Sequence, residues 1–252
     1  MKKNLLLTLT VALCVGVSTT CFAGFGLPKV PGTSKESKPA ASASKESASA
    51  VDLTDITNKQ GNIIKYMCGG LYAQLRAYQV VDEATGNADP ELAQVQEGLK
   101  KKNNAAIKKA QSVLEKKQKA MSAQQKADVQ KNEEQVAKLA QAIKSGKAYQ
   151  QAAIINYGVV AAQAPGALKE ATSAVKNLTK DPMAANKVNG AISTYKIGVE
   201  LSGKAQAVSS AYEKNVGALK SEYGVTEEAL NKASSPDVNA IANECLDFVN
   251  GK

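Results

Sequence analysis

Apolar residues recur at steps of three and four through the second part of the chain, residues 51–252. The first such run contains Ile56, Ile63, Ile64, Met67, Leu71, Leu75, Tyr78 and Val81. This spacing brings apolar side chains to one face of an α-helix, whereas a half-buried strand alternates strictly between apolar and polar residues. No segment of this region alternates convincingly, so the sequence predicts an all-α fold.

The expected helices have recognisable ends. Asp89-Pro90 and Asp181-Pro182 each join an N-cap residue to a proline that suits the first helical position. Gly224 is placed to end a long helix. Ser122 and Gln125 have the spacing of a capping box, which predicts a break near Met121.

Proline predicts one more interruption, because Pro165-Gly166 should end or kink the helix that contains it. We therefore expect five or six helices, several of them long and joined by short turns. The simplest way to bury their apolar faces is an elongated antiparallel bundle.

Two segments of the helical region admit more than one interpretation. Gly69-Gly70 lies inside an apolar run, where a kink, a close helix contact or a hinge would each explain the two glycines. Residues 152–164 are almost uniformly apolar. They suit a buried core, and the alternative is an insertion-competent element of a membrane-active protein.

The chain begins with an export signal. Lys2 and Lys3 precede an apolar run at residues 5–17, and Cys21-Phe22-Ala23 supplies small residues at the −3 and −1 positions of a cleavage site. We expect residues 1–23 to be removed on export to the periplasm or the medium. A lipoprotein cut before Cys21 is the alternative. No later segment has 18 uninterrupted apolar residues, so no transmembrane span is expected in the mature chain.

Residues 24–50 are rich in Ser, Ala, Lys, Gly and Pro. Such a composition buries too little apolar surface to offset the entropy lost on ordering. We expect a flexible linker here and a helical-bundle domain over residues 51–252.

Two of the four cysteines lie in the predicted signal, which leaves Cys68 and Cys245 in the mature chain. An even number of cysteines in an oxidising compartment predicts a disulfide between them. Two separate buried thiols are the alternative. The predicted bridge would join the first helix to the last.

The absence of certain residues excludes several classes of function. The chain has no histidine, which removes the commonest general acid–base, nucleophile-pair and zinc chemistries. Neighbouring carboxylates such as Asp82-Glu83 point about 100° apart on a helix and form no converging pair. No phosphate loop or other catalytic motif is present. We therefore expect a protein that is not an enzyme and has no cofactor or metal site.

Charge is the strongest functional signal. Residues 96–147 contain 13 lysines and five acids, within a chain of formal net charge +9. Six of these lysines are candidates for a surface that binds anions: Lys101, Lys102, Lys108, Lys109, Lys116 and Lys119. The alternative is a solvated helix face with no partner.

The candidate partners are an anionic lipid, an acidic polymer of the cell envelope and an acidic protein. Nucleic acid is not expected, because the chain has a single arginine, Arg76, and few aromatic rings. The sequence thus favours an exported binding or scaffold protein with a cationic helical arm. A membrane-active or pore-forming protein of long helices is the alternative.

Overall fold

The computed structural model describes residues 53–121 and 132–252, which belong to the compact unit Ser49–Lys252. The regular structure in these two ranges is entirely helical, which confirms the all-α prediction for them. The predicted signal peptide (residues 1–23), the predicted linker (residues 24–50) and the capping box expected at Ser122 and Gln125 lie outside the described residues.

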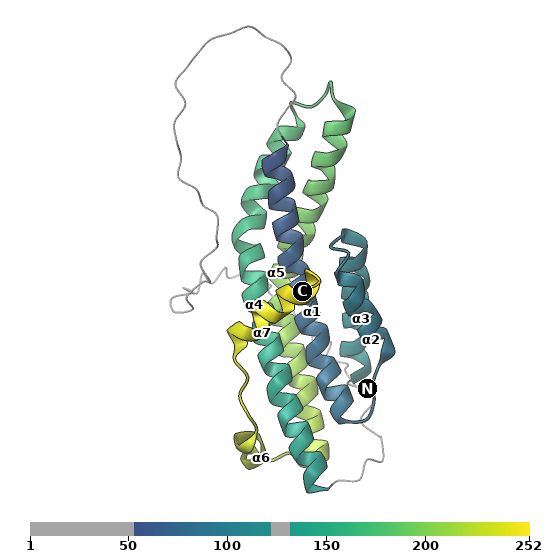
Figure 1. The fold of residues 1–252 in the computed structure, drawn as a ribbon, viewed down its shortest axis with the longest axis vertical. Coiled ribbons are helices and arrows are strands. Elements are labelled where there is room, and N and C mark those ends of the chain that lie inside the picture. The colour runs from purple at the N-terminus through teal and green to yellow at the C-terminus, as the bar shows by residue number, and fades with distance from the viewer. Residues whose placement is uncertain (1–52, 122–131) are drawn as a thin grey trace, which may run out of the picture. The chain divides into compact units, whose positions relative to one another are not determined.

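The described ranges contain seven helices (Figure 1). They are α1 (Thr54–Ala84), α2 (Pro90–Leu99), α3 (Asn104–Met121), α4 (Glu133–Val175), α5 (Pro182–Tyr223), α6 (Glu227–Lys232) and α7 (Val238–Val249). The two aspartates expected as caps do cap helices. Asp89 accepts a hydrogen bond from the backbone N–H of Glu91, and Asp181 accepts one from that of Ala184.

Helices α1 and α4 pack side by side and run in opposite directions. The Lys59 ammonium of α1 lies 2.5 Å from the Glu170 carboxylate of α4. At the opposite end of α1, Gln135 of α4 donates to the carbonyl oxygen of Ala84. With 43 residues, α4 is about 64 Å long, so it extends along the whole of α1.

Helix α5 packs against both of these helices and runs in the direction of α1. The Tyr195 hydroxyl donates to the carbonyl oxygen of Ile56 at 2.7 Å. Further along both helices, the rings of Tyr78 and Tyr212 meet edge to face, with centroids 5.1 Å apart. The core between the three helices is largely small and aliphatic, with tyrosines filling the wider spaces.

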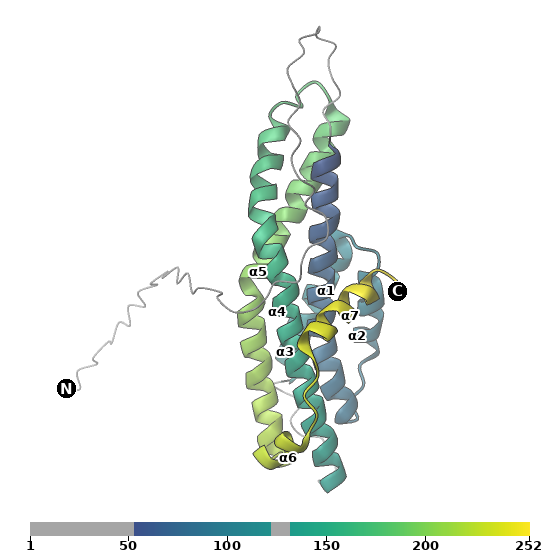
Figure 2. The ribbon, with the colours of Figure 1, turned by 60° about the vertical axis from the view of Figure 1, so that its left-hand side comes forward.

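The shorter helices lie on this three-helix centre. Helices α2 and α3 form a hairpin against α1, and α3 also contacts α5. Helix α7 lies across α1 and α4 instead of along them (Figures 1 and 2). Helix α1 therefore contacts α2, α3, α4, α5 and α7.

Gly69 and Gly70 permit close packing, which is one of the interpretations given above. A Cβ atom on Gly70 would lie 2.8 Å from the Tyr157 ring, and one on Gly69 would lie 2.8 Å from Leu246 Cδ2. Helix α1 is unbroken through the pair. Gly70 therefore lets α4 pack closely against α1, and Gly69 lets α7 do so.

Pro165 does not end its helix, so that part of the prediction is wrong. Helix α4 continues from Glu133 to Val175 with the proline inside it. Pro165 and Ala161 are both exposed, so water can hydrogen-bond the Ala161 carbonyl that lacks its usual N–H donor. Ala164 and Ala167 on either side are buried, and their packing keeps the helix continuous. Residues 152–164 form part of this helix and contribute to the core.

Helices α2 and α3 are separate, although apolar residues recur at helical spacing from Leu92 to Leu114. The connection turns at Lys102, which has φ = 45°. This left-handed conformation costs a residue other than glycine about 1–2 kcal/mol. Asn103 then caps α3 by accepting a hydrogen bond from the Ala106 N–H at 2.8 Å. This break and the short α6 bring the count above the expected five or six helices.

Candidate functional site

The six candidate lysines all lie exposed on the hairpin formed by α2 and α3. We call them the basic face: Lys101, Lys102, Lys108, Lys109, Lys116 and Lys119. The four on α3 lie within about 100° of one another around the helix axis. They share one side of a single helix and point into solvent.

Lys101 and Lys102 belong to the basic face but not to α3. Lys102, Lys109 and Lys116 are seven positions apart, the spacing of residues on one side of a helix, but α3 begins at Asn104 and so does not include Lys102. Lys102 instead extends from the connection, where its ammonium donates to Asn250 Oδ1 at 3.2 Å. The basic face therefore consists of one helical side and the loop that precedes it.

Lys117 of α3 points the opposite way, into the contact with α1. Its ammonium lies 2.6 Å from the Asp82 carboxylate and 3.6 Å from that of Asp89. The side chains of Lys117 and Asp82 are only 7% and 6% exposed, so this ion pair is buried. The sequence did contain a signal for the burial of Lys117. This residue follows the buried residues Ala110 and Leu114 by seven and three positions, so it falls on the apolar face of the helix.

The pKa of Asp82 is raised to about 6, and burial is the main cause. The Lys117 ammonium opposes this rise, while the carboxylates of Asp89 and Glu83 add to it. Glu83 itself points to a different partner, Arg76, at 2.9 Å. The adjacent carboxylates of Asp82 and Glu83 therefore diverge, each toward a different cation.

Amide and tyrosine groups surround the ion pair. The Asn215 side chain donates to the backbone carbonyl oxygen of Gln118 at 3.0 Å, which ties α5 to the end of α3. Burial raises the pKa of Tyr78, and the side chains of Asn215 and Gln118 oppose that rise. At this end of α3 the contact with the helices beneath it is therefore polar, whereas Ile107, Ala110, Val113 and Leu114 make the rest of it apolar.

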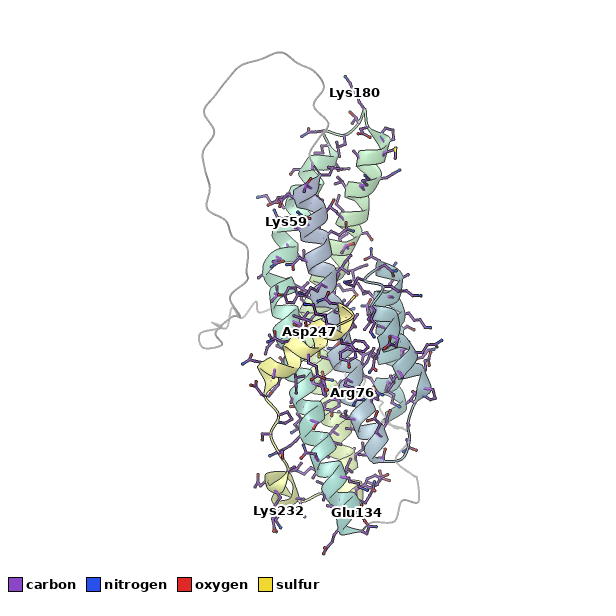
Figure 3. The ribbon with its side chains drawn as sticks, viewed as in Figure 1. Lys59, Arg76, Glu134, Lys180, Lys232 and Asp247 are labelled. Carbon is purple, nitrogen blue, oxygen red and sulfur yellow. The ribbon has the colours of Figure 1, made fainter. Side chains whose placement is uncertain are left out.

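The connection between α2 and α3 also touches α7. The Phe248 ring of α7 stacks on Tyr72 of α1, with centroids 4.1 Å apart and planes at 18°. The Lys100 ammonium lies 4.3 Å from the Phe248 centroid. Three segments that are distant in sequence therefore meet at one aromatic ring. The label for Asp247, the neighbour of Phe248, marks this part of the molecule in Figure 3.

Both cysteines of the helical unit are buried free thiols, and the predicted disulfide is not formed. Burial raises the pKa of each thiol to about 12, so both are neutral. Cys68 lies on α1 next to Gly69, and Cys245 lies on the buried face of α7. The arrangement is the alternative given with the prediction, two thiols that pack as small apolar groups.

Among the described residues, no group of three or more His, Cys, Asp or Glu residues could hold a metal ion. None of the described helices combines the length and apolar character needed to cross a membrane. A hollow over α7, lined in part by Tyr72, Glu244, Asp247 and Lys252, offers charges of both signs.

Comparisons of the chain with family models, with curated proteins and with solved structures give no match.

Proposed function

We propose that this protein is an exported, non-enzymatic binding or scaffold protein whose basic face contacts an anionic surface. One observation carries the proposal. The six lysines of the basic face are exposed on one hairpin, whereas Lys117 in the same helix is buried against Asp82. A helix that merely needed solubility would have no need to gather so many charges of one sign.

The proposed interaction is electrostatic. Residues 90–121 contain eight lysines and three acids, so the hairpin carries a formal excess of positive charge. The two large apolar side chains that are exposed in the described ranges, Met183 and Val199, lie on α5. The hairpin thus offers charge and no apolar anchor, which suits contact with a surface better than insertion into it.

The three long helices would serve as the support. In this proposal α1, α4 and α5 form an elongated antiparallel bundle that presents the hairpin on one side. The export signal predicted at residues 1–23 places the protein in the periplasm or outside the cell, where anionic lipids, acidic envelope polymers and acidic proteins are the candidate partners.

The test measures sedimentation of the mature protein with phosphatidylglycerol vesicles and its retention on immobilised polyglutamate. Each lysine close to an anionic membrane contributes on the order of 1 kcal/mol. We expect clear binding at 0.1 M salt and loss of binding by 1 M salt, because the Debye length falls from about 10 Å to about 3 Å. Phosphatidylcholine vesicles should not bind.

Two matched variants locate the binding surface. The first replaces the six lysines of the basic face by glutamine, which keeps helix propensity nearly constant. The second makes the same change at six exposed lysines outside the hairpin: Lys169, Lys176, Lys180, Lys187, Lys196 and Lys214. Lys180, in the turn between α4 and α5, is labelled far from α2 and α3 in Figure 3. Only the first variant should lose binding.

Three results would count against the proposal. Equal loss in the two variants would show that net charge alone attracts the protein. Absence of binding by the parent protein at low salt would make the basic face a solvated surface. Release of a trapped dye from the vesicles would favour the membrane-active alternative instead.

A further inference from the structure

Two lysines at the connection between α2 and α3 hold the last turn of α7. Lys100 places its ammonium over the Phe248 ring at 4.3 Å, and Lys102 donates to Asn250 at 3.2 Å. An ammonium over an aromatic face at an exposed site contributes a small but real attraction. Phe248 is also stacked on Tyr72, so these two lysines and one ring account for much of the contact at this end of α7.

Helix α7 depends on such contacts. It has 12 residues, a length at which an isolated helix is marginal in water. Its buried side chains are Ile241, Ala242, Cys245 and Val249. Leu246 additionally meets Gly69, and the Ala242 carbonyl oxygen accepts a hydrogen bond from Asn156 at 3.4 Å. The helix is therefore kept in place by packing on α1 and α4.

The segment that leads into α7 is fixed independently. Gln141 of α4 donates to the Ser234 carbonyl oxygen at 3.2 Å and accepts from the Ser234 N–H at 2.9 Å. Lys144 donates to the carbonyl oxygen of Ala233 at 2.8 Å. Helix α7 can therefore leave α1 as a unit, with its preceding segment still attached to α4.

Opening of α7 has a built-in chemical reporter. Cys245 is fully buried in the closed arrangement and lies on the face of α7 that packs against the bundle. A thiol reagent can reach it only when α7 has moved away. The rate of its modification therefore follows the population of the open state, provided that closing is faster than the chemical reaction.

From these contacts we infer that Lys100 and Lys102 couple α7 to the basic face: an anionic surface that draws their ammonium groups away from Phe248 and Asn250 loosens α7 and exposes Cys245. The inference rests on the proposed function, because it requires an anionic surface to engage the hairpin. Under this inference, binding of the hairpin to an anionic surface also loosens α7.

The coupling must be reciprocal. If an anionic surface favours the open state of α7, then variants that open α7 must bind that surface more tightly, at most by the factor by which the surface prefers the open state. Phe248→Leu removes the ring and keeps an apolar side chain, and Asn250→Ala removes the acceptor for Lys102. Each should raise the affinity for phosphatidylglycerol vesicles while leaving every lysine of the basic face in place.

The experiment follows modification of the mature protein by 5,5′-dithiobis(2-nitrobenzoate), with peptide mass mapping to assign the modified cysteine. Without vesicles, Lys100→Gln should speed modification of Cys245 about two- to fivefold, the factor expected for loss of an exposed cation–π contact. The control variant, Lys187→Gln, removes an exposed lysine of α5 that lies outside the basic face, and it should leave that rate unchanged. Phosphatidylglycerol vesicles should speed the modification of Cys245 in the parent protein, and phosphatidylcholine vesicles should not.

Sedimentation in the same samples separates the two proposals. Vesicle binding without any change in the thiol rate would overturn the coupling and leave the proposed function standing. Lack of vesicle binding would overturn both the proposed function and the coupling by anions. If Cys245 is modified at the same rate in the Lys100→Gln variant as in the parent protein, then Lys100 does not hold α7.

Discussion

Helix α1 contacts α3 and α7 at two positions of different chemistry. At Asp82 the contact with α3 contains a buried ion pair. At Gly69 and Tyr72 the contact with α7 contains a leucine and stacked rings, and Cys245 lies neutral on the same buried face of α7. A buried charge that moves away from its partner is left uncompensated, which costs much free energy. Apolar groups can shift against one another with a smaller cost in free energy. The first contact therefore specifies how α3 sits, and the second leaves α7 freer to move.

The largest effect should come from breaking the polar contact on one side only. Lys117→Met leaves the Asp82 carboxylate buried without its nearest cation, which costs about 3–5 kcal/mol. Urea unfolding followed by circular dichroism would measure the change. The double variant Asp82→Leu/Lys117→Met should recover most of the loss, because an apolar pair can replace a buried ion pair.

Lys116→Met is the matched control for this prediction, since Lys116 is the exposed neighbour of Lys117. Its effect should stay within about 0.5 kcal/mol. If Lys117→Met were as mild as Lys116→Met, the buried pair would not determine the position of α3.

The next effect is the pH dependence that the same contact creates. The pKa of Asp82 is raised from 3.8 to about 6 in the folded protein, so the native state binds more protons than the unfolded state between these values. Stability should therefore fall as pH rises from about 4 to about 6. At 1.36 kcal/mol per pKa unit, the loss attributable to Asp82 is about 3 kcal/mol.

Urea unfolding at several pH values, with Asp82→Asn beside the parent protein, would isolate this contribution. The stability difference between the two proteins should change through that window and level off above pH 7. A difference that is constant between pH 4 and pH 7 would contradict the raised pKa of Asp82.

The smallest effect should come from crowding the apolar contact. A Cβ atom added by Gly69→Ala would lie 2.8 Å from Leu246 Cδ2 and 3.2 Å from Asn156 Nδ2. Overpacking costs about 1–3 kcal/mol, and alanine returns up to about 1 kcal/mol through helix propensity. We expect a net loss of about 1 kcal/mol in urea unfolding, since the end of a leucine side chain can move aside.

Gly158→Ala serves as the control, because nothing lies within 4 Å of a Cβ atom at that exposed helical position. It should stabilise the protein by up to about 1 kcal/mol. A loss of several kcal/mol from Gly69→Ala would show that the α7 contact is as rigid as the α3 contact, which would also weaken the case for release of α7.

Local signals in the sequence were sufficient to predict features that depend on residues a few positions apart. The aspartates before Pro90 and Pro182 predicted two helix starts correctly, because an N-cap acts within three residues. Lys109 and Lys116, seven positions apart and so on one side of α3, are both exposed. Asn103 is a local signal for the start of α3, but apolar residues recur at helical spacing on both sides of it.

The sequence by itself determined that this region is helical and which sides of its helices are apolar or basic, because helical periodicity depends on neighbours a few positions away. Only the tertiary structure decided that α4 continues through Pro165, because packing on both sides of the proline offsets its missing hydrogen bond. It also decided that Lys117 pairs with Asp82, 35 positions earlier in the chain, and that Cys68 and Cys245 stay apart as thiols. These outcomes depend on which faces meet in space, and residue spacing along one helix carries no information about its partner.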